Sequence, residues 1–550
     1  MKKFLAFFLA LTLVLGLCAC GGGSGAAGGN GDNLTADGKV KLSIGIGTNA
    51  LVLDHDNNAL TKWVEETCGV ELEFVEFSGG TDIATQISTK IGARQELPDI
   101  LFGMNLNNDT LSRYGQDGYF VDLTPYYEDK EGASKTFWDR ITNELTEDQQ
   151  DYILRNIKDP TTEAFYGVPI VETSLIDKMQ FVPWINTQWL DKLGLEMPTD
   201  VDSLYTVLKA FKDGDPNGNG QADEIPLFGS ESAGLCAYVV DWLINMYQYD
   251  NPNRRYLVDD DGKVYMSYTT EAYREGLKFV NKLYKEGLLT SLAWSASSNE
   301  MKQITTPSSG TALCGIFLGH LTVHATMEND ILYQYQPLPQ WGCVIRNDIS
   351  CKNSTFITED CEEEKRDKAF EVLMTLWSWD GSMRVRYGEY GVNWKDATPG
   401  AKSDIGLDAT YQLVSDPLKM QSTAKWAVIA STLNVYAEGE TAEIAAEMTE
   451  WMKTKSKMHA DAYALFEKAE TENNPKNIPP VLVASQEEKD AVDAERTNVS
   501  ERAARAQTEF CTGTLDPNSD ADWNAYLAEL ESYGLQTYIE YLQMLYDRQA

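Results

Sequence analysis

The N-terminal part of the chain alternates short β-forming runs with amphipathic helical patterns. "VKLSIGIG" (40–47), "VELEFVEF" (70–77) and "DILFG" (99–103) have the apolar, β-branched character of strands. Helical periodicity lies between them, around 57–67 and 82–94. Strands separated by helices of this length are typical of parallel β-α-β units. The sequence therefore predicts an α/β fold, in which loops after the strands bind the ligand.

The alternation of strands and helices continues downstream. We predict extended runs at 163–172, 178–186 and 311–319 and helices at 198–212 and 271–287. From about Lys365 onward the pattern is mostly helical, and it ends in helices over 519–548. The chain has 550 residues, which is more than one compact core usually holds. Two domains or two lobes are therefore expected.

The first residues have the layout of a secretory signal. Lys2 and Lys3 precede the apolar run 4–17, which is too short to span a membrane. The junction "LCAC" resembles the lipobox of bacterial lipoproteins, and that resemblance implies that Cys20 carries a lipid anchor. Cys18 is a rival cleavage position, although the small residue before Cys20 favours the latter. An ordinary secretory signal with an incidental cysteine is the alternative.

A Gly/Ser/Ala-rich stretch follows this junction at 21–33, and such sequences behave as flexible coils. We therefore expect a signal peptide over 1–19 and the anchor cysteine with its tether over 20–38. The mature protein would be held at the extracytoplasmic face of the cell membrane. No later segment is apolar enough to cross it.

Charge and cysteine content exclude several function classes. The chain has 46 Lys and Arg against 84 Asp and Glu, a formal charge of −38. Nucleic-acid binding needs clustered cations, so nucleic acid is not an expected partner, and adsorption to an anionic membrane is disfavoured. The scattered cysteines form no CxxC pair and so indicate neither zinc nor a disulfide framework. A bridge between Cys343 and Cys351 is left open.

Several motifs, in this order, resemble those of one protein family. They are "ELPDILFG" (96–103), "WINTQWLDKLGLEMPTDVDSL" (184–204), "LYKEGLL" (283–289), "YGEYGVNW" (387–394), "FCTGTLD" (510–516) and "DWNAYLAELESYGL" (522–535). Together they resemble the extracellular solute-binding proteins of bacterial carbohydrate ABC importers. The similarity is to family 1, the LplA type, which includes the alginate-oligosaccharide-binding proteins.

This resemblance implies a periplasmic-binding-protein type II fold, with two α/β lobes, a hinge and a helical C-terminal part. We expect lobe 1 over 39–165 and 309–380, and lobe 2 over 166–308 and 381–550. The expected partners are an oligosaccharide held between the lobes and the transmembrane subunits of an ABC permease. We expect a monomer that attaches to the membrane by its lipid anchor only.

"DGDPNGNGQADEIP" (213–226) has the spacing of a calcium loop. Counting from Asp213 gives Asp213, Asp215, Asn217, Asn219, Gln221 and Glu224 as ligand positions. Counting from Asp215 gives Asp215, Asn217, Asn219, Gln221 and Asp223, with Glu224 beside them. The resemblance favours the second register and a structural Ca²⁺. A strand-like run follows the loop, which excludes a sensor, and a metal-free turn is the alternative.

Aromatic and polar residues after strands are the candidate ligand contacts, because flat aromatic faces pack on sugar rings. By resemblance we expect Trp184, Trp242, Trp394 and Trp426 to face the sugar from lobe 2, with core packing as the alternative. On lobe 1 we predict that Asn105, Asn107 and His320 line the cleft, and that Tyr166 and Glu172 flank the crossover. His320 and His324 have a zinc-like spacing, but no third ligand is recognisable.

These inferences predict a lipid-anchored, non-catalytic protein that delivers an oligosaccharide to a permease. One alternative is a secreted carbohydrate-active hydrolase or lyase, for which the sequence nominates no carboxylate pair. No nucleophile-elbow, HExxH or phosphate-loop motif is present. The other alternative is a ligand-binding module for a sensor kinase.

Overall fold

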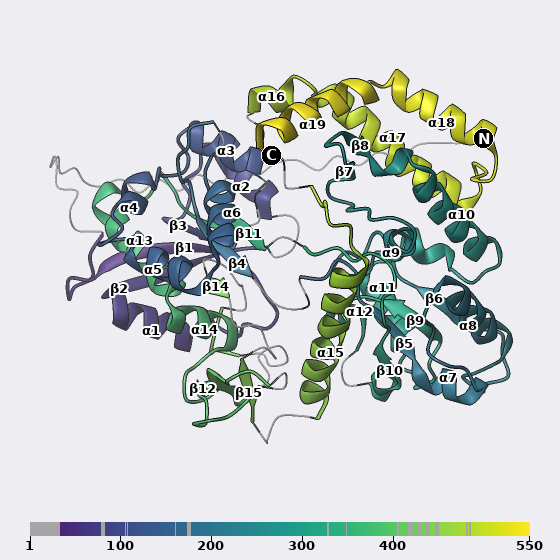
Figure 1. Ribbon diagram of the computed structural model, residues 1–550. Helices are drawn as coiled ribbons and strands as arrows, with labels where there is room; N and C mark the ends of the chain where they lie inside the picture. Colours follow the sequence, from purple (N-terminus) through teal and green to yellow (C-terminus); the bar gives the residue numbers. More distant parts are fainter. Residues whose placement is uncertain are drawn as a thin grey trace, which may run out of the picture.

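The computed structural model describes residues 33–549 apart from 79–82, 105, 107, 160, 173–175, 177, 327–328, 348, 404–405, 416–421, 427–431, 435–440, 446–449, 480–481, 483 and 485. The described chain forms two α/β bodies (Figure 1). We call the body built on a six-stranded sheet the first lobe and the body built on a four-stranded sheet the second lobe. Cys20 lies outside the described residues.

The first-lobe sheet has the strand order β14-β4-β11-β3-β1-β2. Its strands are β1 (Val40–Gly47), β2 (Val70–Phe77), β3 (Ile100–Phe102), β4 (Val168–Glu172), β11 (Ser350–Ile357) and β14 (Leu433–Asn434). Ile44 of β1 pairs in parallel with Phe74 and Ile100, which confirms the predicted β-α-β units. β11 runs antiparallel to β3 and β4 and inserts between them.

Helices cover both faces of this sheet. They are α1 (Ala59–Cys68), α2 (Ile83–Gly92), α3 (Asn108–Gln116), α4 (Thr124–Glu128), α5 (Lys135–Glu144), α6 (Glu147–Ile157), α13 (Glu363–Trp377) and α14 (Trp379–Tyr387). The N-cap of α1 is Asn58, whose side chain accepts a hydrogen bond from Leu60 N, and its C-cap is Gly69 in the left-handed conformation. Both helix limits are therefore set by local sequence.

The second-lobe sheet has the order β10-β5-β9-β6. Its strands are β10 (Tyr335–Pro337), β5 (Pro183–Asn186), β9 (Cys314–Leu318) and β6 (Ile225–Phe228). β9 lies between β5 and β6, antiparallel to the former and parallel to the latter. The segment from 309 to about 346 therefore belongs to the second lobe, which differs from its expected place in lobe 1. The strand itself was predicted, but the sheet it joins depends on distant partners.

Short helices and a hairpin complete the second lobe. They are α7 (Thr187–Leu193), α8 (Val201–Asp213), α9 (Val239–Asn245), β7 (Tyr256–Val258), β8 (Val264–Met266), η1 (Ser267–Thr269), α10 (Glu271–Lys285), η2 (Ser291–Trp294), α11 (Ser298–Thr305), α12 (Leu321–His324) and η3 (Asp330–Gln334). The side chain of Asp200 caps α8 by accepting a hydrogen bond from Ser203 N. The helix buries Leu204, Leu208 and Phe211, as its apolar periodicity predicted.

The C-terminal part is helical, as predicted, and packs on the second lobe (Figure 1). It contains α15 (Glu450–Asn473), α16 (Gln486–Asp490), α17 (Asp493–Thr512), α18 (Asp520–Ser532) and α19 (Leu535–Gln549). Phe510 and Trp523 are buried in the same hydrophobic cluster as the second-lobe sheet. The N-cap of α18 is Ser519, one residue before Asp520.

A small sheet interrupts the region that was predicted to be mostly helical. It consists of β12 (Trp394–Asp396), β13 (Tyr411–Leu413) and β15 (Ala442–Ile444). β13 pairs antiparallel with β12 and parallel with β15. Strands of three residues carry too little periodicity to be recognised from sequence.

The first-lobe core extends beyond residue 380, where the first lobe was expected to end. Trp426 and Leu433 are fully buried in the same cluster as Ile44 and Phe102. The chain therefore returns to the first lobe after α14 before it passes to α15. The expected lobe boundaries contain too few crossings, because the chain passes between the lobes more often than those boundaries allow.

Candidate functional site

One edge of the second-lobe sheet gathers the ends of several strands. Pro183 at the start of β5 pairs with Leu318 at the end of β9, and Phe228 at the end of β6 pairs with Phe317. The loops that adjoin these residues, 178–182, 229–238 and 319–320, therefore lie at the same edge. The first of them is the crossover from the first lobe. Loops at the carboxyl ends of strands are where open α/β sheets bind ligands.

His320 and His324 build the turn after β9. The backbone N–H of His320 donates to Nδ1 of His324 (3.0 Å), and Thr322 N donates to Nδ1 of His320 (3.2 Å). Both Nδ1 atoms accept, so each ring in its neutral form carries its proton on Nε2. His324 is fully buried, and this burial lowers its pKa to about 4. His324 is thus bound into the turn, whereas His320 is only half-buried.

His459 of α15 lies beside His320 and is a residue of the site that its sequence pattern did not predict. The two ring centroids are 5.3 Å apart, and the ring of Trp184 lies 6.3 Å from that of His459. Burial, together with the charges of His320 and Lys455, lowers the pKa of His459 well below its ordinary value. Its Nε2 is enclosed without a hydrogen-bond partner. A lone histidine in a late helix gave no sequence signal for this placement.

Trp184 is fully buried between the second-lobe sheet and α15. Its indole N–H donates to the carbonyl of Gly319 (2.8 Å). Trp242 lies in α9 and is also buried, where it lines a small cavity together with Trp341 and Gly342. Neither ring presents an open face in this structure, which differs from the expected sugar-facing arrangement.

Trp394 and Trp426 are both fully buried. The indole N–H of Trp394 donates to Gly388 O (2.9 Å), and the ring meets Trp379 and Tyr390 edge to face. Trp426 was expected on a late helix of lobe 2. It lies instead in a non-helical segment of the first-lobe core, where its N–H donates to Thr61 Oγ1 (2.9 Å). Satisfied indole donors and packed faces are features of core residues.

Two of the remaining predicted contacts, Tyr166 and Glu172, lie on the first lobe. Tyr166 is buried, and its ring packs so closely on Gly115 that an added Cβ there would lie 2.4 Å away. Glu172 ends β4, is half-buried and pairs with Arg386 (3.4 Å). Asn105 and Asn107 follow β3 and lie outside the described residues.

The acidic loop between α8 and β6 folds around Asp215. Oδ1 of Asp215 accepts from Gly218 N (3.0 Å) and Oδ2 accepts from Gly220 N (3.2 Å). Both glycines have a φ of +74°, which side chains other than glycine rarely adopt. Asp213, by contrast, belongs to α8 and pairs with Lys209 one turn earlier (3.4 Å). The loop is thus organised from Asp215.

The other predicted ligand side chains converge within this loop. The amides of Asn217 and Asn219 donate to the carboxylate of Asp223, and Gln221 N donates to Oδ1 of Asn219 (2.7 Å). Oε1 of Glu224 is buried without a partner. Burial raises the pKa of Glu224, and the charges of Asp215 and Asp223 raise it further. Among the described residues, no three His, Cys, Asp or Glu side chains are arranged as a metal site.

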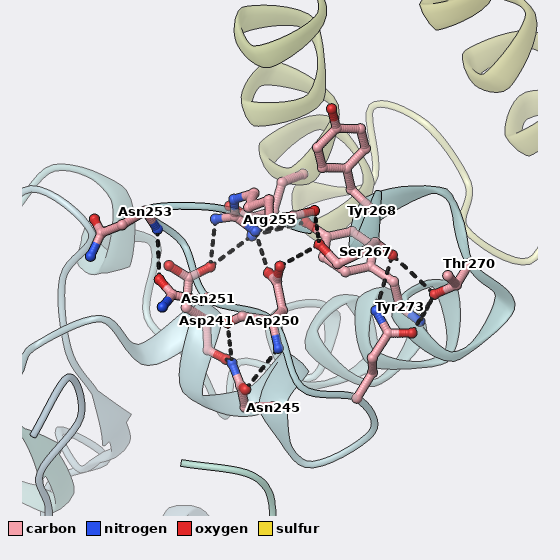
Figure 2. Close-up of polar contacts among 12 residues, drawn as sticks. Asp241, Asn245, Asp250, Asn251, Asn253, Arg255, Ser267, Tyr268, Thr270 and Tyr273 are labelled. Carbon is pink, nitrogen blue, oxygen red and sulfur yellow. Dashed lines mark hydrogen bonds and ion pairs between the residues drawn. The ribbon is translucent and has the colours of Figure 1, made fainter. Parts of the chain in front are cut away.

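A buried ion-pair network lies between α9 and the β7-β8 hairpin (Figure 2). Arg255 pairs with Asp250 and with Asp241 (2.9 Å), and Ser267 donates to Asp250. Burial raises the pKa of Asp250, whereas Arg255 lowers it. Asn245 donates to the backbone carbonyls of both aspartates (2.9 Å each). Both carboxylates therefore form ion pairs with Arg255, and both are buried.

The network also attaches the C-terminal helices. Gln507 of α17 donates from Nε2 to Asp241 (3.0 Å) and to the hydroxyl of Tyr273 (3.1 Å). Glu231 lies nearby and accepts from Val240 N (2.8 Å), and burial raises its pKa well above the ordinary value. The arrangement is that of a structural polar core.

The seven cysteines in the described residues are free thiols, so Cys343 and Cys351 are not bridged. Burial raises the pKa of the Cys351 thiol to about 12 and that of Cys343 to about 11. Neither thiol is therefore activated as a nucleophile. No helix in the described part of the chain has the length and apolar character of a membrane span.

The chain matches the family model of bacterial extracellular solute-binding proteins over residues 55–341. It is 23% identical over 511 residues to FusA of Streptococcus pneumoniae serotype 4, a fructooligosaccharide ABC transporter substrate-binding protein. The match covers 90% of this chain and 88% of FusA. Both lobes and the helical C-terminal part fall within a match of this length.

Solved structures share the fold across nearly the whole chain. FusA in complex with kestose superposes with a TM-score of 0.68 at 20% identity, covering 92% of this chain and 99% of that one. An HMO-binding solute-binding protein of Bifidobacterium longum infantis gives 0.72 at 21% identity, with coverages of 93% and 99%.

The alginate-binding protein AlgQ2, solved without calcium ion, gives a TM-score of 0.62 at 20% identity, covering 94% and 99%. These structures and the two α/β lobes agree with the matched family model, which spans the first-lobe sheet strands β2 to β4 and most of the second lobe. The chain belongs to the family of bacterial extracellular solute-binding proteins.

Proposed function

We propose that this protein captures an oligosaccharide between its two lobes and delivers it to the transmembrane subunits of an ABC permease, without catalysis. The observation that carries the proposal is the match to FusA, a fructooligosaccharide-binding protein, over 90% of the chain. A binding protein of this kind gains affinity from the difference between its open and closed states. It therefore needs both lobes, and the similarity extends over both.

We propose that the ligand contacts the strand-end loops of both lobes. His320 supports this on the second lobe, because it lies at the strand-end edge and is half-buried beside His459. Glu172 ends β4 on the first lobe, and Asn105 and Asn107 follow β3. Imidazole, carboxylate and amide groups are those that fix sugar hydroxyls. Trp184, which is buried beside His459 and donates to Gly319 O, then supports the second-lobe side of the site from behind.

We propose that the acidic loop binds a structural Ca²⁺ with Asp215 as its first residue. Asp215, Asn217, Asn219, Asp223 and Glu224, with the carbonyl of Gln221, would supply the oxygen ligands. The unpartnered, buried Oε1 of Glu224 and the charges of Asp215 and Asp223, which raise the pKa of Glu224, support a divalent cation here. When bound, the ion would neutralise these carboxylates and fix the connection between α8 and β6.

We propose that Cys20 anchors the protein to the extracytoplasmic face of the membrane. The support is the lipobox-like "LCAC" junction and the Gly-rich tether after it. Cys20→Ser should move the protein from the membrane fraction to the soluble fraction, whereas Cys18→Ser should leave it in the membrane. Release by the second substitution alone would assign the anchor to Cys18.

The transport proposal is tested by a thermal-shift screen with fructooligosaccharides, milk oligosaccharides and alginate and pectin fragments. We expect at least one glycan to raise the melting temperature, and calorimetry to give one site per chain. His320→Ala should weaken that binding, whereas Ser532→Ala on the exposed face of α18 should not. New reducing ends or unsaturated products at enzymatic rates would replace the proposal with a hydrolase or a lyase.

A further inference from the structure

Two strands cross between the lobes side by side. Met179 pairs with Arg346 in an antiparallel bridge, Gln180 N donates to Ile345 O (3.0 Å) and Asn347 N donates to Lys178 O (2.9 Å). The same two chain segments pair again in the second lobe through β5 and β10, and in the first lobe through β4 and β11. We call the paired segments 178–180 and 345–347 the ribbon. Met179, Val344 and Ile345 are buried in the second-lobe core, so the base of the ribbon lies there.

Helix α15 clamps the base of the ribbon through Arg346. The guanidinium donates from Nε to Oε1 of Glu470 (2.8 Å), from Nη2 to Oε2 of the same residue, and from Nη1 to the hydroxyl of Tyr463 (3.1 Å). It also lies over the rings of Tyr463 (5.7 Å) and Phe466 (5.2 Å). The guanidinium of arginine provides this combination of a two-pronged carboxylate contact and aromatic stacking, and lysine does not.

The end of α15 continues the same attachment. Nδ2 of Asn474 donates to Val344 O (2.8 Å), and its Oδ1 accepts from Val344 N (2.8 Å). Nδ2 of Asn473 donates to Gly342 O (3.1 Å). Lys178, on the other strand of the ribbon, lies over the Tyr463 ring (5.7 Å). One helix thus holds both strands of the ribbon.

We propose that Arg346 is a positioning residue that fixes the direction in which the ribbon leaves the second lobe, and so sets how the lobes face each other. α15 and the ribbon base then move with the second lobe as one body. The reason is geometric, because a small change of angle at the base of the ribbon displaces the whole first lobe. This inference rests on the lobe closure of the proposed function, but its test needs no sugar.

The test compares ligand-free wild type with Arg346→Gln and Arg346→Lys. Arg366→Gln is the matched control, because Arg366 pairs with Glu359 (2.7 Å) on the first lobe, away from the ribbon. In both Arg346 variants we expect a broader distribution of interlobe distances by small-angle X-ray scattering. Amide hydrogen exchange over 176–182 and 340–347 should be roughly tenfold faster. The control should match wild type in both measurements.

If Arg346 has a purely local role, its substitution should speed amide exchange without changing the scattering profile, and that result would overturn the proposal. Wild-type exchange and scattering in Arg346→Lys would also overturn it. If Arg346→Gln does not fold, Glu470→Gln provides the second test. It keeps the size of the side chain and the Tyr463 contact but removes the charged acceptor. Failure here would leave the proposed sugar binding intact, since that is measured separately by calorimetry.

Discussion

His324 shows how one buried side chain makes stability depend on pH. Its ring accepts from His320 N and faces Ala233 O, so it links the turn after β9 to the loop after β6. Burial lowers its pKa to about 4, against an ordinary value of 6.5. The unfolded chain therefore takes up a proton at a higher pH than the folded one. The stability that this neutral ring contributes is complete above pH 6.5 and declines as the pH falls towards 4.

We predict that His324→Gln flattens this pH dependence. Glutamine keeps an acceptor and a donor but does not titrate, so the variant should lose roughly 2 kcal/mol less stability than wild type between pH 6.5 and 4. Urea unfolding at several pH values measures the difference. His459 titrates in both proteins and cancels. Parallel curves for the two proteins would refute the assignment to His324.

The sequence predicted the chemistry of individual residues better than their surroundings. It marked Trp184 as a strand-end aromatic, but the acceptor of its indole N–H is Gly319, 135 residues away. Trp426 is satisfied by Thr61, at a still larger separation. Burial decided by such distant partners leaves no local signal. The neighbouring imidazole of His459 was missed for the same reason.

At the scale of elements, the acidic loop allows its register to be tested. We predict that Ca²⁺ raises the melting temperature of wild type, because an ion that binds only the folded state stabilises it, by about 2.7 kcal/mol at 100 times Kd. Asp215→Ala and Asp223→Ala should abolish the response to Ca²⁺. Asp213→Ala is the matched control and should keep it, because Asp213 pairs with Lys209 in α8.

Differential scanning fluorimetry with calcium and with a chelator makes this comparison. If Asp213→Ala abolished the response and Asp223→Ala kept it, the register that begins at Asp213 would be correct. An unresponsive wild-type protein would leave the loop as a metal-free turn. The first outcome would change only the ligand assignment, whereas the second would remove the ion.

The amide of Gln507 joins helix α17 to the buried ion-pair network. Gln507→Ala removes the donor to Asp241 and Tyr273, and buried groups left unpaired cost about 1–3 kcal/mol. We expect the free energy of unfolding to fall by that amount and exchange in α17 to accelerate. Gln536→Ala is the control, since its bond to Glu540 is exposed. Equal effects of the two substitutions would contradict a structural role for the network.

Elements with strong periodicity were predicted well. The strands at 40–47 and 70–77 and the helix capped by Asp200 lie where their patterns placed them. The small sheet was missed because its strands are short and β13 pairs with β15 across 31 residues. Pairing of this kind is stabilised by long-range contacts that a local pattern does not contain.

At the scale of the whole molecule, the sequence pattern did not predict which lobe each segment joins. β9 was predicted as a strand but placed in lobe 1, whereas it pairs with β5 and β6. The two lobes therefore have separate hydrophobic cores, and crossing strands join them. Which core a strand joins depends on the packing of complete sheets, and a single sequence does not record that.

Capture between two lobes makes a prediction that binding to one lobe does not. A sugar at a thousand times its Kd should stabilise the folded protein by about 4.1 kcal/mol. Because the ligand would contact both lobes, amide exchange should slow in the loop after β9 and in the loop after β3 together. Mass spectrometry of the protein with and without the sugar found in the screen measures both. Protection confined to 319–324 would mean that the second lobe binds alone, and closure would then add nothing to affinity.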